Sequence, residues 1–237
     1  MSDFDEKIIE RLKRLEREVE RLQVKEQPDK TGWMPIPNGF AINTDYNASI
    51  GLVDVTNKAI FSTGDKIKFT QDGSVHYAYV IAINTIYQSI QISGGSDYTF
   101  SKNAITNAYY STATTPLGFP QWFNWTPTLN TGAADLSGYT LARFCKVGTI
   151  TYIKFDVSNK SLSGSSGLIE VSLPDTPKIY STMMLAKAYP IGGTYVFVDS
   201  QARDTGKMTI AKGTFANSWV GDETGVYISV SGFYETE

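Results

Sequence analysis

The chain has 237 residues, enough for two small domains that each bury a core of their own. Its formal net charge of −3 comes without the clustered Lys and Arg residues that bind a phosphate backbone, which argues against nucleic-acid binding. A composition with 13% aromatic residues, rich in Tyr, Gly, Ser and Thr, favours strands and turns over helices.

The first 27 residues form the one strong helical pattern of the sequence. Within this segment, almost every position outside the apolar seam is Glu, Lys or Arg. A seam this narrow has nothing to bury against in a single chain, so we predict an oligomerising coiled coil over residues 1–27. The apolar positions recur at spacings of four, three, four and three, at Ile8, Leu12, Leu15, Val19 and Leu22.

Residues 28–39 are rich in Pro and Gly, which predicts a linker. Two apolar residues inside it, Trp33 and Met34, are expected to dock onto the first β domain or a neighbouring chain. Residues 40–115 then read as short strands broken by turns and predict a small β-barrel domain. The expected strands are 49–55, 66–70, 75–83 and 89–92, with a hairpin turn at Gln71-Asp72-Gly73-Ser74 between the second and third.

A second Pro- and Gly-rich boundary near residues 112–121 precedes the last predicted domain, residues 116–237. Strict alternation is clearest in residues 151–157, where Ile153, Phe155 and Val157 are expected to face inward. Trp122 and Trp125 are expected to pack at the domain junction. The spacing of strands and turns predicts an antiparallel, jelly-roll-like β-sandwich with strands near 141–147, 149–157, 167–173, 183–188, 194–198, 207–210 and 225–233.

Single residues restrict the chemistry of the chain. Cys145 is the only cysteine and His76 the only histidine, so neither a disulfide nor a cysteine-based zinc site can form within one chain. No metal and no cofactor are expected. The charged N-terminus lacks the apolar stretch of a secretory signal, and no segment is long and apolar enough to span a membrane, which predicts synthesis in the cytoplasm without membrane insertion.

Three segments resemble structural proteins of tailed phages and prophages. Residues 93–120, which read SGGSDYTFSKNAITNAYYS and then TATTPLGFP, resemble a module of such proteins. Residues 64–83, GDKIKFTQDGSVHYAYVIAI, are similar to the small barrel that precedes it. Residues 125–157, which begin WTPTL and continue through ARFCKVGTITYIKFDV, resemble the opening strands of the C-terminal β-sandwich of phage tail fibres and receptor-binding proteins.

The resemblance implies a non-enzymatic homotrimer in a virion or phage-tail-like particle. Its N-terminal region would contact other tail or baseplate proteins, and its C-terminal sandwich would recognise a host cell-surface polysaccharide. A purely structural decoration or baseplate subunit, which contacts only particle proteins, is the alternative. An enzyme that trims surface polysaccharide ranks third, because the carboxylates of Asp199, Asp204 and the pair Asp222-Glu223 lie in turns where Asp caps backbone groups.

A saccharide site needs exposed aromatic rings beside amides and carboxylates, since a sugar packs an apolar face on a ring while its hydroxyls need directed hydrogen bonds. The C-terminal domain offers these groups around Trp219, with closure of the sandwich core as the competing role for this residue. The candidate residues are Trp219, Asn217, Asp222, Glu223, Tyr195 and Arg203.

Overall fold

The structure is a computed structural model that describes residues 30–36, 41–47, 50–54, 60–84, 89–130, 139–162, 169–178, 181–189, 196–203, 205–212 and 223–236. This part of the chain is mainly β, with antiparallel sheets, and contains no α-helix. The expected fold class, with its N-terminal helical coiled coil, is therefore wrong for what the structure describes. The predicted oligomerisation residues, Ile8, Leu12, Leu15, Val19 and Leu22, lie outside the described residues.

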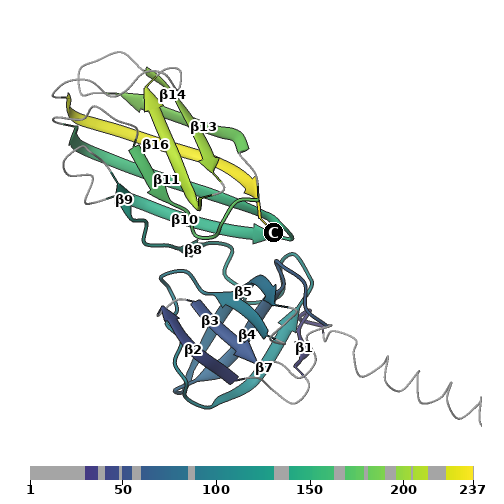
Figure 1. The fold of residues 1–237 in the computed structure, drawn as a ribbon. Coiled ribbons are helices and arrows are strands. Elements are labelled where there is room, and N and C mark those ends of the chain that lie inside the picture. Colours follow the sequence, from purple (N-terminus) through teal and green to yellow (C-terminus); the bar gives the residue numbers. More distant parts are fainter. Residues whose placement is uncertain are drawn as a thin grey trace, which may run out of the picture.

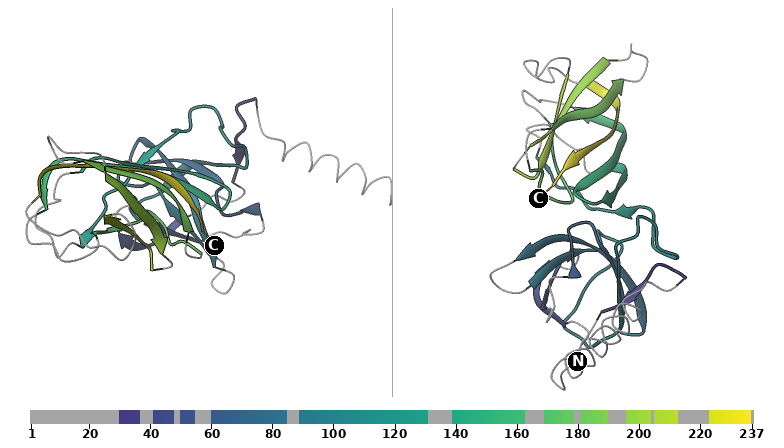
Figure 2. Two further views of the ribbon diagram at one scale, coloured as in Figure 1. Left: turned by 90° about the horizontal axis from the view of Figure 1, so that it is seen from above. Right: turned by 90° about the vertical axis from the view of Figure 1, so that its right-hand side faces the viewer.

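The first module is one antiparallel sheet of seven strands in the order β1-β7-β4-β5-β6-β3-β2. Its buried side chains include Ile67, Phe69, Val80 and Ile92, which form one core. The described pairings leave β1 and β2 as edges, so the sheet is curled rather than closed into a barrel (Figure 2). The strands are β1 (Met34–Pro35), β2 (Ala41–Asn47), β3 (Ile50–Asp54), β4 (Lys66–Gln71), β5 (Ser74–Asn84), β6 (Ser89–Ser93) and β7 (Ile105–Ser111).

The hairpin between β4 and β5 confirms a turn predicted from sequence. Its two turn residues, Asp72 and Gly73, have φ angles of 52° and 77°. Two consecutive positive φ values fit the right-handed twist of a tight hairpin, and Asp-Gly accepts them at low cost. The strands then pair from Lys66 opposite Tyr79 to Gln71 opposite Ser74.

The second module is one antiparallel sheet of nine strands in the order β8-β10-β11-β16-β13-β14-β15-β12-β9. The early strands β10 and β11 therefore pair beside the last strand, β16. The strands are β8 (Phe123–Asn124), β9 (Leu129–Asn130), β10 (Tyr139–Val147), β11 (Ile150–Leu162), β12 (Ile169–Ser172), β13 (Ser181–Tyr189), β14 (Val196–Arg203), β15 (Lys207–Lys212) and β16 (Glu223–Glu235).

Alternation along β11 buries Ile153, Phe155 and Val157, as the sequence predicted, and leaves Tyr152 and Lys154 exposed. These buried residues share one core with side chains of β12, β15 and β16. The sheet thus curves around its own core, which is compatible with a β-sandwich. A jelly-roll of two separate sheets is not seen, because the described strands join into a single sheet.

The two modules lie end to end (Figure 1), and the chain crosses from one to the other between Ser111 and Phe123. The segment expected to be a linker contributes β1 to the first sheet, where Met34 pairs with Tyr110. Trp33 beside it is buried and donates an indole hydrogen bond to the carbonyl oxygen of Leu117 at 2.9 Å. The predicted docking of Trp33 and Met34 onto the first module is therefore confirmed.

Candidate functional site

The junction between the modules is a chain of aromatic side chains in mutual contact. Tyr79 of the first module belongs to the core of the second, with its ring centroid 5.0 Å from that of Phe123. Phe119, in the crossing segment, lies 5.1 Å from Tyr79 and 5.7 Å from Tyr77 in edge-on geometry. Such tilted aromatic contacts stabilise beyond the area they bury. Tyr98 packs against both buried cores, so aromatic side chains join the two cores across the junction.

Backbone contacts reinforce this junction. Gly95 has a φ angle of 61°, and a Cβ added to it would lie 2.1 Å from the carbonyl oxygen of Asn124. The next residue, Ser96, donates its N–H to that same oxygen at 2.7 Å. Asn124 in turn donates its backbone N–H and its side-chain amide to the carboxylate of Asp97, at 2.8 and 2.7 Å. Only glycine permits the modules to approach this closely at position 95.

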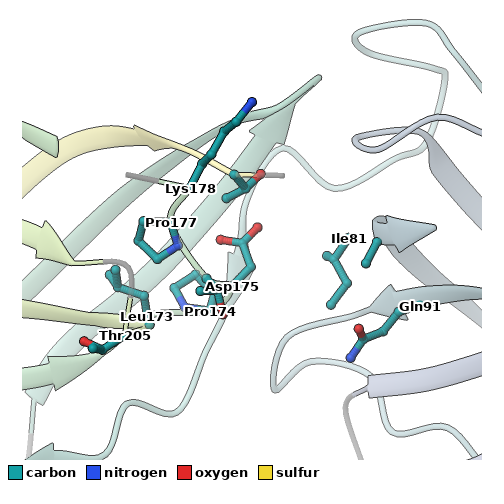
Figure 3. A pocket seen from close by; sticks show the side chains of 12 residues that line it. Ile81, Gln91, Leu173, Pro174, Asp175, Pro177, Lys178 and Thr205 are labelled. Atoms are coloured by element: carbon teal, nitrogen blue, oxygen red, sulfur yellow. The ribbon is translucent and has the colours of Figure 1, made fainter. Parts of the chain in front are cut away.

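A cleft of about 660 Å³ opens beside the junction. On the first module it is lined by Ile81, Ala82 and Gln91, and Figure 3 shows Ile81 and Gln91 facing Asp175 across the gap. The second module contributes the turn Leu173, Pro174, Asp175, Thr176, Pro177 and Lys178, together with Thr205, Gly206 and Thr236. Clefts between domains are a common location for ligand sites.

Behind the cleft, a buried ion pair fixes the turn that carries Asp175. The ammonium nitrogen of Lys146 lies 2.8 Å from Asp175 Oδ2, and the two side chains are 0% and 6% exposed. Lys146 also donates to the hydroxyl oxygens of Thr151 and Thr236. The hydroxyl of Tyr234 donates to Asp175 Oδ1 at 2.5 Å. Burial, and next the negative charge of Asp175, hold the pKa of Tyr234 well above its usual value, so this donor keeps its proton.

This arrangement makes Asp175 a structural acceptor. Both of its carboxylate oxygens already receive hydrogen bonds from the chain, from Lys146 and Thr151 on one oxygen and Tyr234 on the other. Hydrolysis of a glycosidic bond by the common route needs two carboxylates that flank the bond. Among the described residues that line the cleft, Asp175 is the only carboxylate.

Cys145 and His76 are the remaining candidates for nucleophilic or metal chemistry. Cys145 is partly buried, and burial raises the pKa of its thiol, which keeps it protonated and a poor nucleophile. The His76 ring stacks on Phe69 with centroids 5.4 Å apart. Within the described part of the chain, no group of three or more His, Cys, Asp or Glu side chains is placed to hold a metal ion.

The structure describes two of the six residues proposed for saccharide binding, and it places them at opposite ends of the sheet. Arg203 ends β14 and pairs with Lys207, next to the cleft. Glu223 begins β16 opposite Leu162, at the end far from the first module (Figure 1). Their separation follows from the strand register, which the local sequence does not reveal. Tyr195, Asn217, Trp219 and Asp222 lie outside the described residues, and the saccharide site stays a prediction.

The prediction that Trp122 and Trp125 pack at the junction was wrong for both residues. The side chain of Trp122 is 40% exposed, and Trp125 is buried in the second core, where it donates its indole N–H to the carbonyl of Ser172 at 3.1 Å. Phe119 and Phe123 fill the junction instead. The sequence analysis missed both, because their common partner Tyr79 is distant in sequence. It missed the Lys146–Asp175 pair for the same reason, since these two residues meet only through the fold.

Neither a protein-family model, nor a curated protein, nor a solved structure matches this chain. No helix in the described part of the chain has the length and apolar character needed to cross a membrane.

Proposed function

We propose that this chain is a non-catalytic tail-fibre or receptor-binding protein of a phage or phage-tail-like particle. In this proposal its N-terminal region attaches to other tail or baseplate proteins, and its C-terminal module recognises a host cell-surface polysaccharide. The resemblance of three sequence segments to phage structural proteins supports it. The single structural observation that supports it best is the continuous aromatic core between two antiparallel β modules.

This junction suits an adhesin because attachment at one end must be mechanically coupled to recognition at the other. A flexible linker would let the recognition module swing independently of the particle. Here the close contact of Gly95 with Asn124 and the carboxylate of Asp97 on Asn124 tie the modules at backbone level. The C-terminal module is thereby held in a defined direction relative to the first module.

The position of β16 supports recognition at the distal end. Residues 213–222, which include Asn217, Trp219 and Asp222, connect Lys212 at the end of β15 to Glu223 at the start of β16. Residues 190–195, which include Tyr195, connect Tyr189 to Val196. In the sheet register, Tyr189 lies opposite Tyr227 and Ala188 opposite Val196. The strands that these segments join therefore meet near the start of β16, which is the end of the module far from the first module (Figure 1).

Self-association as a homotrimer is part of the proposal and rests on the sequence resemblance. Three weak saccharide sites on one body raise the effective concentration of the second and third contacts, so attachment is firm even when each site binds weakly. Light scattering of the purified full chain tests it. A mass three times that of the single chain is expected, and a monomer in solution would contradict the homotrimer.

Immunogold electron microscopy of particles from cells that produce the chain tests the placement. Gold at the distal tip of a tail or fibre is the expected result. Label on a capsid, or confined to the inside of a baseplate, would instead favour the alternative in which the protein contacts only other particle proteins. Absence of the chain from any particle would refute both.

A further inference from the structure

We propose that the outer face of β10, β11 and β16 is a platform for a neutral saccharide, centred on Tyr152 and Phe233. This inference rests on the proposed saccharide-binding function, and it adds a second site on the face of the C-terminal sheet, at the end of β11 and β16 opposite to Glu223 and near the first module. Figure 1 shows the three strands side by side. Tyr152 lies opposite Phe233 in the register of β11 and β16.

The two rings form an exposed aromatic pair. Tyr152 is 39% exposed and Phe233 38% exposed, and their ring centroids are 5.8 Å apart with a tilt of 48°. Neighbouring Val147 of β10 is 42% exposed. Both rings keep more than a third of their area exposed side by side on a regular sheet, although large aromatic side chains are usually buried more deeply. The pair offers two ring surfaces against which the apolar face of a sugar can pack.

Polar groups lie next to the rings on the same face, because side chains two positions apart on a strand point the same way. Lys154 lies two residues beyond Tyr152, opposite Ser231 on β16 and Arg143 on β10. The guanidinium of Arg143 donates to the amide oxygen of Asn124 at 3.2 Å. Lys154, Ser231 and Arg143 form a polar band that begins about 7 Å from the aromatic pair along β11. The band extends across β10, β11 and β16, which are spaced about 5 Å apart.

The same band supplies hydrogen-bond acceptors. Asp156 lies two residues beyond Lys154, with 3.9 Å between the carboxylate oxygen and the ammonium nitrogen. The hydroxyl of Ser229 donates to Asp156 at 2.5 Å, which fixes the orientation of the carboxylate. Aromatic rings, an amide, a carboxylate and cationic donors thus occur together here among described residues. This is the combination that saccharide recognition requires.

The charges favour a neutral saccharide. Arg143 and Lys154 on this face are balanced by Asp156 and Glu235, so the described side chains present no net field that would attract a polyanion. A second copy of this chain is a poorer occupant. A stable protein interface buries roughly 1,200–2,000 Å², and the exposed area of three apolar side chains is a small fraction of that.

Binding of the full-length protein to an array of neutral and acidic oligosaccharides tests the platform. The wild type is expected to bind neutral glycans, with little change between low and high salt, because no counterions are released. The double variant Tyr152→Ala/Phe233→Ala is expected to bind at least about tenfold more weakly, since two stacking contacts are lost. Trp122→Ala, an exposed aromatic residue of the crossing segment, is the matched control and should bind like the wild type.

Thermal unfolding of each variant shows whether it is folded, and light scattering shows whether its mass has changed. Unchanged glycan binding by the folded double variant, combined with loss of binding in Trp219→Ala, would overturn the platform and leave the proposed function standing. Binding only to acidic glycans, or a double variant that loses oligomer mass, would also overturn it. If the wild type binds no glycan of either kind, saccharide recognition itself fails.

Discussion

At the residue scale, Lys146 and Asp175 form a buried ion pair in the second module. The Lys146 ammonium is fully buried against Asp175, so Lys146→Met would leave a buried carboxylate without its counter-charge. Loss of one partner of such a pair costs about 3–5 kcal/mol. Urea denaturation should show this decrease in the free energy of unfolding.

Lys207→Met provides the matched control for that measurement. Lys207 and Glu170 are also 2.8 Å apart, but their side chains are 40% and 26% exposed. Solvent screens such a pair, and its loss should cost about 0–1 kcal/mol. Equal losses in the two variants would mean that burial of Lys146 adds nothing to its contribution.

The raised pKa of Tyr234 predicts how the free energy of unfolding depends on pH in the alkaline range. Burial raises the pKa of this phenol in the folded protein above the value of about 10 for an exposed tyrosine. Between the two values the unfolded chain loses the proton and the folded chain keeps it, so the contribution is complete below about pH 10 and disappears as the pH rises further. Urea midpoints between pH 8 and 11 should decrease most steeply above pH 10.

The variant Tyr234→Phe should be less stable at neutral pH, because it lacks the hydrogen bond to Asp175, and should show a shallower alkaline decrease. A smaller alkaline dependence should remain, since burial also raises the pKa of Tyr79. If Tyr234→Phe and the wild type lose stability in parallel above pH 10, the Tyr234 phenol is not the cause of the alkaline loss of stability.

At the scale of elements, local sequence signals predicted what depends on local physics. Asp72-Gly73 predicted the β4–β5 hairpin because few dipeptides accept two positive φ angles. Alternation predicted the buried side of β11 because side-chain direction has a period of two. The register of β11 with β16 was not predictable, since these strands are far apart in sequence and many antiparallel partners satisfy the same pattern. The single nine-stranded sheet follows from such pairings and was missed for that reason.

A substitution at Gly95 tests how closely the two modules pack. Gly95→Ala places a methyl group against the carbonyl oxygen of Asn124 and should destabilise the junction by clearly more than the strain of a positive φ, which is about 1–2 kcal/mol. Gly73→Ala is the control, because Gly73 has a φ angle of 77° with no atom within 4 Å of an added Cβ. If the two variants unfold at the same denaturant concentration, the contact at position 95 is not tight.

At the scale of the whole molecule, the shared aromatic core predicts that the modules unfold together. Calorimetry of the full chain should show one transition whose van't Hoff and calorimetric enthalpies agree. Phe119→Ala removes the ring between Tyr77, Tyr79 and Phe123, so its transition should broaden or split. Val75→Ala, at a side chain that is 49% exposed, should leave the single transition intact.

Recognition of a surface polysaccharide without cleavage is the central claim, and one measurement addresses it directly. Purified full-length protein is incubated with polysaccharide extracted from the surface of candidate host bacteria, and both binding and polymer size are followed by light scattering. We predict binding to the polysaccharide of the host and no change in polymer size over hours. A shortened polymer would identify an enzyme, and failure to bind the polysaccharide of any host would contradict the receptor-binding function.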